Sequence, residues 1–177
     1  YLAPERDPGA QEEAAALTLL ADILGGSSTT SVLAQKLQFE KARSVYSSAY
    51  YRGMSLDDTT FGLINVPPPG VSLEEAAADM DAAIAEFLEE GIDTEQLNRI
   101  KAGIRASRIY AEDSVSSLAR RYGAALTSGL TVDDVEAWPD ILEAVTEEDI
   151  LAAARNVLNR KQSVTSYLMA PSQEVSQ

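Results

Sequence analysis

The spacing of apolar residues changes along this chain, and the change limits the folds that are open to it. Between residues 9 and 26 the apolar positions recur at helical spacing: Ala14, Leu17, Leu20, Ala21 and Leu24. Residues 44–52 and 59–66 are instead rich in aromatic and β-branched side chains, on either side of a loop. Helical spacing then returns for most of the remaining sequence. This order predicts a helical start, an antiparallel hairpin and a longer helical region, which together make an α+β fold.

Start and stop signals divide the helical parts into separate segments. The expected helices span residues 9–26, 32–41, 72–90, 93–110, 113–128, 131–145 and 146–158. Ser72, with Glu75 three residues later, is a capping-box pattern, and Pro139 is expected to interrupt the segment that contains it. Residues 163–169 are predicted to form a final strand, and residues 171–177 a frayed tail.

The expected architecture is a single domain over residues 1–177, with an antiparallel or mixed sheet and helices layered on one face. At 177 residues and 45% hydrophobic, the chain can bury a core of its own. It starts with YLAP, which is neither an initiator methionine nor a leader. We therefore expect a piece of a longer chain.

Histidine and cysteine are both absent from the sequence. This removes the commonest general base, the commonest transition-metal ligand and the thiol nucleophile, although carboxylates could still hold a hard cation. The 28 acidic and 14 basic residues give a net charge of −14, which disfavours nucleic acid and anionic lipid as partners. No apolar run reaches the roughly 18 residues that a membrane span needs. These features indicate a binding or structural unit.

Three local patterns admit both a structural and a functional interpretation. The run GGSS at residues 25–28 follows a helix and lacks the lysine of a phosphate-binding loop, which favours a helix-to-helix turn. The acidic pairs lack the alternating ligands of an EF-hand, so caps and solvated helix faces explain them better. Strand parity puts Tyr46 and Tyr50 on one face of the hairpin and Tyr51 on the other. Core packing is favoured for these tyrosines over a ligand-facing strip.

A longer pattern resembles a known family. The segment LLADILGG at residues 19–26, followed by SVL at 31–33 and by Leu37, is similar to a helix-turn-helix motif of zinc peptidases. These are the peptidases of the insulinase, pitrilysin and mitochondrial-processing-peptidase type, the inverzincins. The runs at residues 67–70, 89–101, 115–140 and 145–171 are similar to bacterial members, so the resemblance covers nearly the whole chain.

The resemblance implies a protease with two homologous α+β halves, of which only one holds zinc through an H-x-x-E-H motif. Without histidine, this chain is similar to the C-terminal, non-zinc half of a bacterial processing-type protease. Where related halves carry an assisting arginine and tyrosine, this chain has Gln38 and, one residue late, Tyr46. A shift of one residue in a strand reverses the direction of a side chain. Gln38, Tyr46 and Tyr50 are therefore candidates for substrate contact only, and no catalytic or metal-binding residue is expected.

The expected function is that of a non-catalytic domain that encloses and positions a peptide opposite a zinc-bearing domain. The resemblance places zinc in that upstream domain and no cofactor in this chain. The implied partners are the upstream domain, a peptide substrate, and a homologous subunit or a second copy. The alternative is a catalytically inactive partner or assembly scaffold of the same superfamily. The bacterial periplasm and cytoplasm are both open as compartments.

Overall fold

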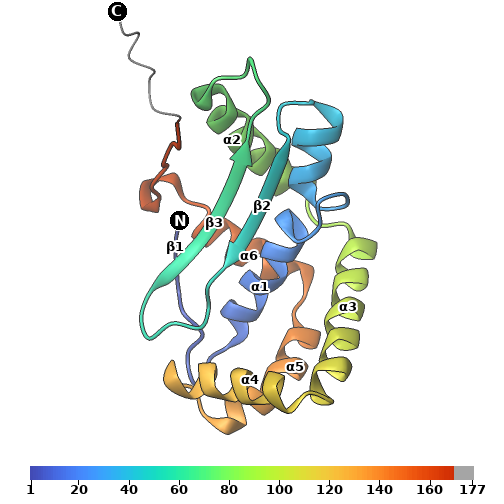
Figure 1. Ribbon diagram of the computed structural model, residues 1–177, viewed down its shortest axis with the longest axis vertical. Coiled ribbons are helices and arrows are strands. Elements are labelled where there is room, and N and C mark those ends of the chain that lie inside the picture. Colours follow the sequence, from blue (N-terminus) through green and yellow to red (C-terminus); the bar gives the residue numbers. More distant parts are fainter. Residues whose placement is uncertain (170–177) are drawn as a thin grey trace, which may run out of the picture.

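The computed structural model describes residues 1–169, in which a small antiparallel sheet lies over a layer of helices (Figure 1). The sheet contains β1 (Leu2–Ala3), β2 (Tyr46–Tyr51) and β3 (Thr59–Val66), in the order β1-β3-β2. Helices α1 and α2 lie against one face of the sheet, α6 packs on both of them, and α4 and α5 cross the end of the molecule below the hairpin. The predicted α+β class, with helices on one face, is confirmed.

The helices follow most of the predicted segments closely. They are α1 (Glu12–Gly25), α2 (Leu73–Glu90), α3 (Thr94–Glu112), α4 (Val115–Thr127), α5 (Val132–Ala144) and α6 (Glu147–Val157). A π-helical segment, η1 (Ala34–Glu40), lies where the sequence predicts the short helix at 32–41. A 3₁₀ turn, η2 (Arg160–Gln162), follows α6.

Side-chain caps determine where several helices begin. The Ser72 hydroxyl accepts a bond from the Glu75 N–H, and the Glu75 carboxylate accepts one from the Ser72 N–H, which confirms the predicted capping box. Such a box satisfies amide groups that have no partner inside the helix. The same arrangement begins α5 and α6, with Thr131 and Asp134 in the first and Thr146 and Asp149 in the second.

The register of the hairpin decides which side chains face the helices. Tyr50 lies opposite Gly62, and Ala49 lies opposite Leu63. Because side chains alternate along a strand, Ala49 and the neighbouring Phe61 point toward the helices, where both are buried. The opposite face of the hairpin has no helix over it (Figure 1).

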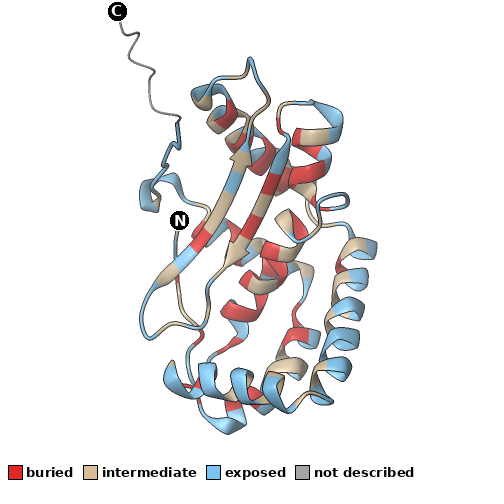
Figure 2. Cartoon of the chain, in the orientation of Figure 1, coloured by how far each residue is buried: buried red, intermediate tan, exposed pale blue. Residues whose placement is uncertain are grey.

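Helix α1 forms the centre of the core (Figure 2). Its buried side chains lie on almost every side of the helix: Ala14, Ala15, Ala16, Leu17, Leu19, Leu20, Ala21, Ile23 and Leu24. A helix that is apolar all round must be covered all round. The sheet covers α1 on one side, while α5 and α6 pack against the others. No helix within residues 1–169 is long and apolar enough to cross a membrane.

Two predictions about the secondary-structure elements are wrong. Residues 163–169 form no strand and make no backbone hydrogen bond within the described chain, and the third strand of the sheet is β1 instead. Pro139 does not interrupt α5, which continues through it. A proline removes one helical hydrogen bond and crowds the preceding turn, but Val135 and Leu142 are buried on either side of Pro139 and hold the helix in place. The predicted tail at 171–177 lies outside the described residues.

Candidate functional site

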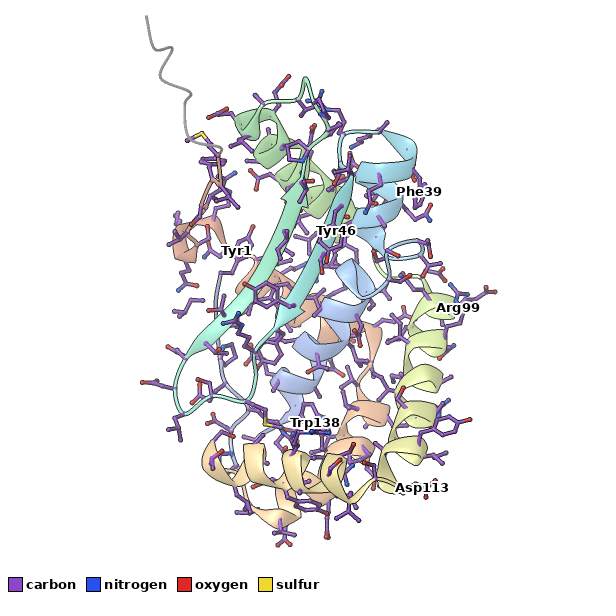
Figure 3. All side chains as sticks on the ribbon, in the orientation of Figure 1. Tyr1, Phe39, Tyr46, Arg99, Asp113 and Trp138 are labelled. Carbon is purple, nitrogen blue, oxygen red and sulfur yellow. The ribbon has the colours of Figure 1, made fainter. Side chains whose placement is uncertain are left out.

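The face of the sheet turned away from the helices carries a strip of aromatic and aliphatic side chains. We call it the outer sheet face and define it by five residues: Leu2, Tyr46, Tyr50, Ile64 and Val66. Tyr46 is 48% exposed and lies directly opposite Val66, which is 43% exposed. Figure 3 shows Tyr46 beside the strands of the hairpin. These side chains share one face of the sheet, and four of them, Leu2, Tyr46, Ile64 and Val66, are exposed within residues 1–169.

Tyr50 is held flat on this surface by its neighbours. Its ring occupies the space above Gly62, where a Cβ atom would overlap the ring carbons. An aromatic side chain that covers a glycine on the adjacent strand compensates for the missing side chain. The Arg52 guanidinium lies 5.2 Å from the centroid of the Tyr50 ring, within the range of a cation–π contact. These contacts hold the ring over Gly62.

Gln38 does not join the two tyrosines. Its side-chain amide donates a 2.8 Å hydrogen bond to the hydroxyl of Ser47, whose side chain is buried on the helix-facing side of β2. This bond ties η1 to β2. Of the three candidate contact residues, the structure therefore brings Tyr46 and Tyr50 together on the outer sheet face and places Gln38 behind the strand.

Tyr51 belongs to the core, as the core-packing interpretation predicts for that residue. Its ring stacks near Phe61 with the centroids 6.5 Å apart, and its hydroxyl donates a 2.6 Å hydrogen bond to the carbonyl oxygen of Pro4. Burial raises the pKa of the Tyr51 hydroxyl above its ordinary value. For the exposed Tyr46 the core-packing interpretation is wrong.

The run GGSS forms the predicted helix-to-helix turn. The Ser27 hydroxyl accepts hydrogen bonds from the N–H groups of Thr29 and Thr30, at 3.3 and 3.1 Å. A hydroxyl that bonds the backbone two and three residues later stabilises a turn locally. In the structure, the Ser27 hydroxyl therefore serves to stabilise the turn itself.

A buried polar cluster near the N-terminus was not visible in the sequence. The Arg6 guanidinium lies 3.8 Å from the centre of the Trp138 ring and donates to the side chain of Gln11 and, at 2.8 Å, to the carbonyl oxygen of Asp134. Burial lowers the pKa of Arg6 to about 10, while the Asp134 carboxylate opposes the change. The cluster fastens the N-terminal segment to α5. Its members are far apart in sequence, so no local pattern could reveal it.

The residues of this chain do not fit a zinc site. Zinc in peptidases is held by histidine and cysteine with at most some carboxylates, and this sequence has neither histidine nor cysteine. Within residues 1–169, no three acidic side chains lie close enough together to hold a metal ion. The chemistry that the outer sheet face offers is that of apolar and aromatic contact.

Several solved structures of peptidases and peptidase domains share the fold of this chain. The chain superposes on a protease from Helicobacter pylori with a TM-score of 0.82 and 18% identity, covering 92% of this chain and 38% of that one. The inactive peptidase domain from Bordetella parapertussis gives a TM-score of 0.75 at 15% identity, covering 89% and 84%. A peptidase M16 inactive domain from Pseudomonas fluorescens gives 0.71 at 21% identity, covering 89% and 36%. The fold is therefore that of M16-type peptidase halves.

The sequence identifies the family within this class of proteins. Residues 3–104, more than half of the chain, match the family model described as the peptidase M16 inactive domain. The chain belongs to this family, which confirms the resemblance to the non-zinc half of an inverzincin. It spans well under half of the Helicobacter pylori protease. A search of curated protein sequences finds no significant match.

Proposed function

We propose that this inactive domain forms one wall of a peptide-binding chamber, opposite a separate zinc-bearing domain of the same protease. The observation that carries the proposal is the outer sheet face, an apolar and aromatic face of the sheet that has no helix over it within residues 1–169. A contiguous exposed apolar surface with a polar rim is typical of an interaction site. The membership of the M16 inactive-domain family supports the same role.

The chemistry of the outer sheet face suits an extended or unfolded peptide. Tyr46 and Tyr50 offer broad apolar contact together with hydroxyls that can bond to a peptide backbone. Ile64 and Val66 add aliphatic contact without charge, so the surface selects little for sequence. The net charge of −14 would favour peptides with basic residues at longer range. Peptide hydrolysis would depend on the zinc-bearing domain, since the sequence has no histidine or cysteine and residues 1–169 bring no acidic cluster together that could hold the metal.

The test uses the complete protease with Tyr50→Ala on the outer sheet face. Loss of one aromatic contact is expected to lower kcat/KM for an unstructured peptide by about fivefold to tenfold. The zinc content, measured by atomic absorption, should stay unchanged because no metal ligand is altered. Tyr110→Ala is the matched control, since Tyr110 is 79% exposed on α3, away from the sheet. Its kcat/KM should equal that of the unaltered protease.

Two results of these measurements would argue against the domain being a wall of the chamber. Equal kcat/KM values for Tyr50→Ala and Tyr110→Ala would contradict the proposal. A complete protein that contains no zinc, cleaves no peptide and forms a stable heterodimer would instead support the alternative of an inactive partner or assembly scaffold.

A further inference from the structure

A cavity of about 540 Å³ lies between the end of α1 and one face of α3. Asp22 and Gly26 line it from the end of α1, and the turn at residues 27–30 lines it next to them. The wall on α3 includes residues that recur at helical spacing: Gln96, Ile100, Gly103, Ile104 and Ser107. The cavity shares no residue with the outer sheet face, so it is a separate feature of the molecule.

Contacts within the chain hold the walls of this cavity in place. The Gln96 amide group donates to the carbonyl oxygens of Thr30, at 2.9 Å, and of Ile23, at 3.4 Å. These bonds fasten the start of α3 to the end of α1. Ile100 and Ile104 pack against the core and give the cavity an apolar surface. The cavity is therefore formed before any ligand enters, as small-molecule sites usually are.

Asp22 is the acidic side chain of this cavity. Its carboxylate lies beside Gly26, since a Cβ atom added to that glycine would come within 2.8 Å of Oδ1. Burial raises the pKa of the Asp22 carboxyl, and no hydrogen bond or charged side chain within residues 1–169 acts against this rise. None of the ion pairs in that part of the chain involves Asp22. A partly buried carboxylate without such a partner is stabilised when a cation binds beside it.

The end of α1 increases the negative potential at Asp22. The carbonyl groups of its last turn give a helix C-terminus a partial negative charge, which favours cations. Asp22 lies in the last turn of α1, and this turn contains no basic residue. Arg99 also lines the cavity, but its side chain is 62% exposed and lies 3.6 Å from Glu95 and 3.9 Å from Asp93 (Figure 3). It therefore balances other carboxylates.

We propose that this cavity binds a primary alkylammonium group, with the nitrogen at the Asp22 carboxylate and the carbon chain along Ile100 and Ile104. An ammonium has three donors around one nitrogen, which can reach a carboxylate and helix-end carbonyl groups together. A bare metal ion needs more oxygen ligands, and residues 1–169 contain no group of three acidic side chains that could hold one. The group can belong to a lysine of a bound peptide or to a free amine.

The experiment is a titration of this chain with n-pentylammonium, followed by NMR of the backbone amides. Shifts are expected at Gly26, Ser27 and Gly103, with a Kd of about 1 mM. Asp22→Asn should weaken binding at least about tenfold, since it removes the charge and keeps the shape. Asp133→Asn is the matched control, because it removes the same charge from an exposed position at the start of α5, outside the cavity. Its Kd should equal that of the unaltered chain.

Three further probes separate the contributions of charge and chain. Methylammonium lacks the carbon chain, n-pentanol lacks the charge, and n-pentanoate carries the opposite charge. Each should bind at least about tenfold more weakly than n-pentylammonium, because each loses one of the two contacts. Binding of n-pentanol or n-pentanoate as tight as that of n-pentylammonium would overturn the proposal. So would equal Kd values for Asp22→Asn and Asp133→Asn.

A peptide probe distinguishes the two sources of the ammonium group. If the cavity takes a lysine side chain, the end-capped peptide Gly-Lys-Gly should bind at least as tightly as n-pentylammonium and shift the same amides. If n-pentylammonium binds and the peptide does not, the ligand is a free amine. Absence of shifts with both probes would contradict the proposal. Because binding is measured without a peptidase assay, the result is independent of the test on Tyr50.

Discussion

Gly25 lies where the last turn of α1 meets the backbone of β2. A Cβ atom at this position would overlap the backbone nitrogen of Ala49, which cannot move aside as a flexible side chain could. A glycine is therefore needed because another backbone approaches closely. Gly62 has a similar neighbour in the Tyr50 ring, but a ring can swing away. A side chain at position 25 would therefore displace backbone, whereas one at position 62 would displace only the Tyr50 ring.

We predict that Gly25→Ala lowers the free energy of unfolding by at least about 2 kcal/mol, because α1 must shift away from β2 and lose core contacts. Gly103→Ala is the control, since a Cβ on this exposed residue of α3 meets nothing within 4 Å. That variant should gain about 0.5–1 kcal/mol from helix propensity. Urea unfolding of both variants measures the difference. A loss no greater than about 0.5 kcal/mol for Gly25→Ala would contradict the close packing.

For single side chains, the sequence predicts which candidate contact residues share a strand face. Strand parity correctly assigns Tyr46 and Tyr50 to one face and Tyr51 to the other. Parity alone does not say which face the helices cover. Leu2, Ile64 and Val66 join the tyrosines only through the register between strands, so the sequence did not indicate them as part of the site.

At the scale of elements, the start of α5 differs from the start of α6 although both use a Thr-x-x-Asp box. Hydrogen bonds from Thr131 and Gly9 lower the pKa of the Asp134 carboxyl, which is also buried beside Arg6. Asp149 makes only the local bonds of the box and is exposed. The box that begins α5 therefore also joins this helix to the N-terminal segment, whereas the box that begins α6 only caps its own helix.

We predict that Asp134→Ala lowers the free energy of unfolding by about 2–4 kcal/mol, since it removes a cap, the carboxylate that accepts from Gly9 and Gln11, and a negative charge near the buried Arg6. Asp149→Ala should be distinctly less destabilising, because that carboxylate has no buried partner. Thermal unfolding followed by circular dichroism compares the two variants directly. Equal losses would mean that the bonds to Gly9 and Gln11 and the nearby Arg6 charge add nothing to the box.

The two wrong element predictions have a common cause. Pro139 breaks helices in isolation, yet α5 is held by the tertiary packing of Val135, Trp138 and Leu142. Residues 163–169 have strand composition, yet a strand forms only beside a partner edge. Local propensity predicted the intrinsic preference of each segment in isolation. Contacts with neighbouring elements in the folded molecule then decided whether each segment adopted the preferred structure.

For the whole molecule, most of the shifted carboxyl groups respond to acid in the same direction. The pKa values of Glu75, Glu86, Asp134 and Asp149 are lowered by hydrogen bonds to their charged forms. Each therefore stabilises the fold above its unfolded pKa, and that stability is lost as the pH falls through its folded pKa. Burial raises the pKa of Asp22, which acts in the opposite direction.

We predict that the urea midpoint falls steeply below about pH 4, where unfolded aspartate and glutamate begin to take up protons. Between about pH 5 and 7 the four carboxylates should contribute no slope, since they stay charged in both states. Asp134→Asn should flatten the acid limb, because one lowered carboxyl is removed. A midpoint that is unchanged between pH 7 and 3 would show that these hydrogen bonds do not contribute to stability.

The sequence by itself determined the class of the fold, the limits of most helices, the hairpin and the membership of a zinc-peptidase family without zinc ligands. These depend on local periodicity, caps and residue content, which act over a few residues. The tertiary structure decided which face of the sheet stays open, that Gln38 lies behind β2, and that β1 rather than residues 163–169 completes the sheet. Each of these depends on contacts between distant segments, whose free energies no local pattern encodes.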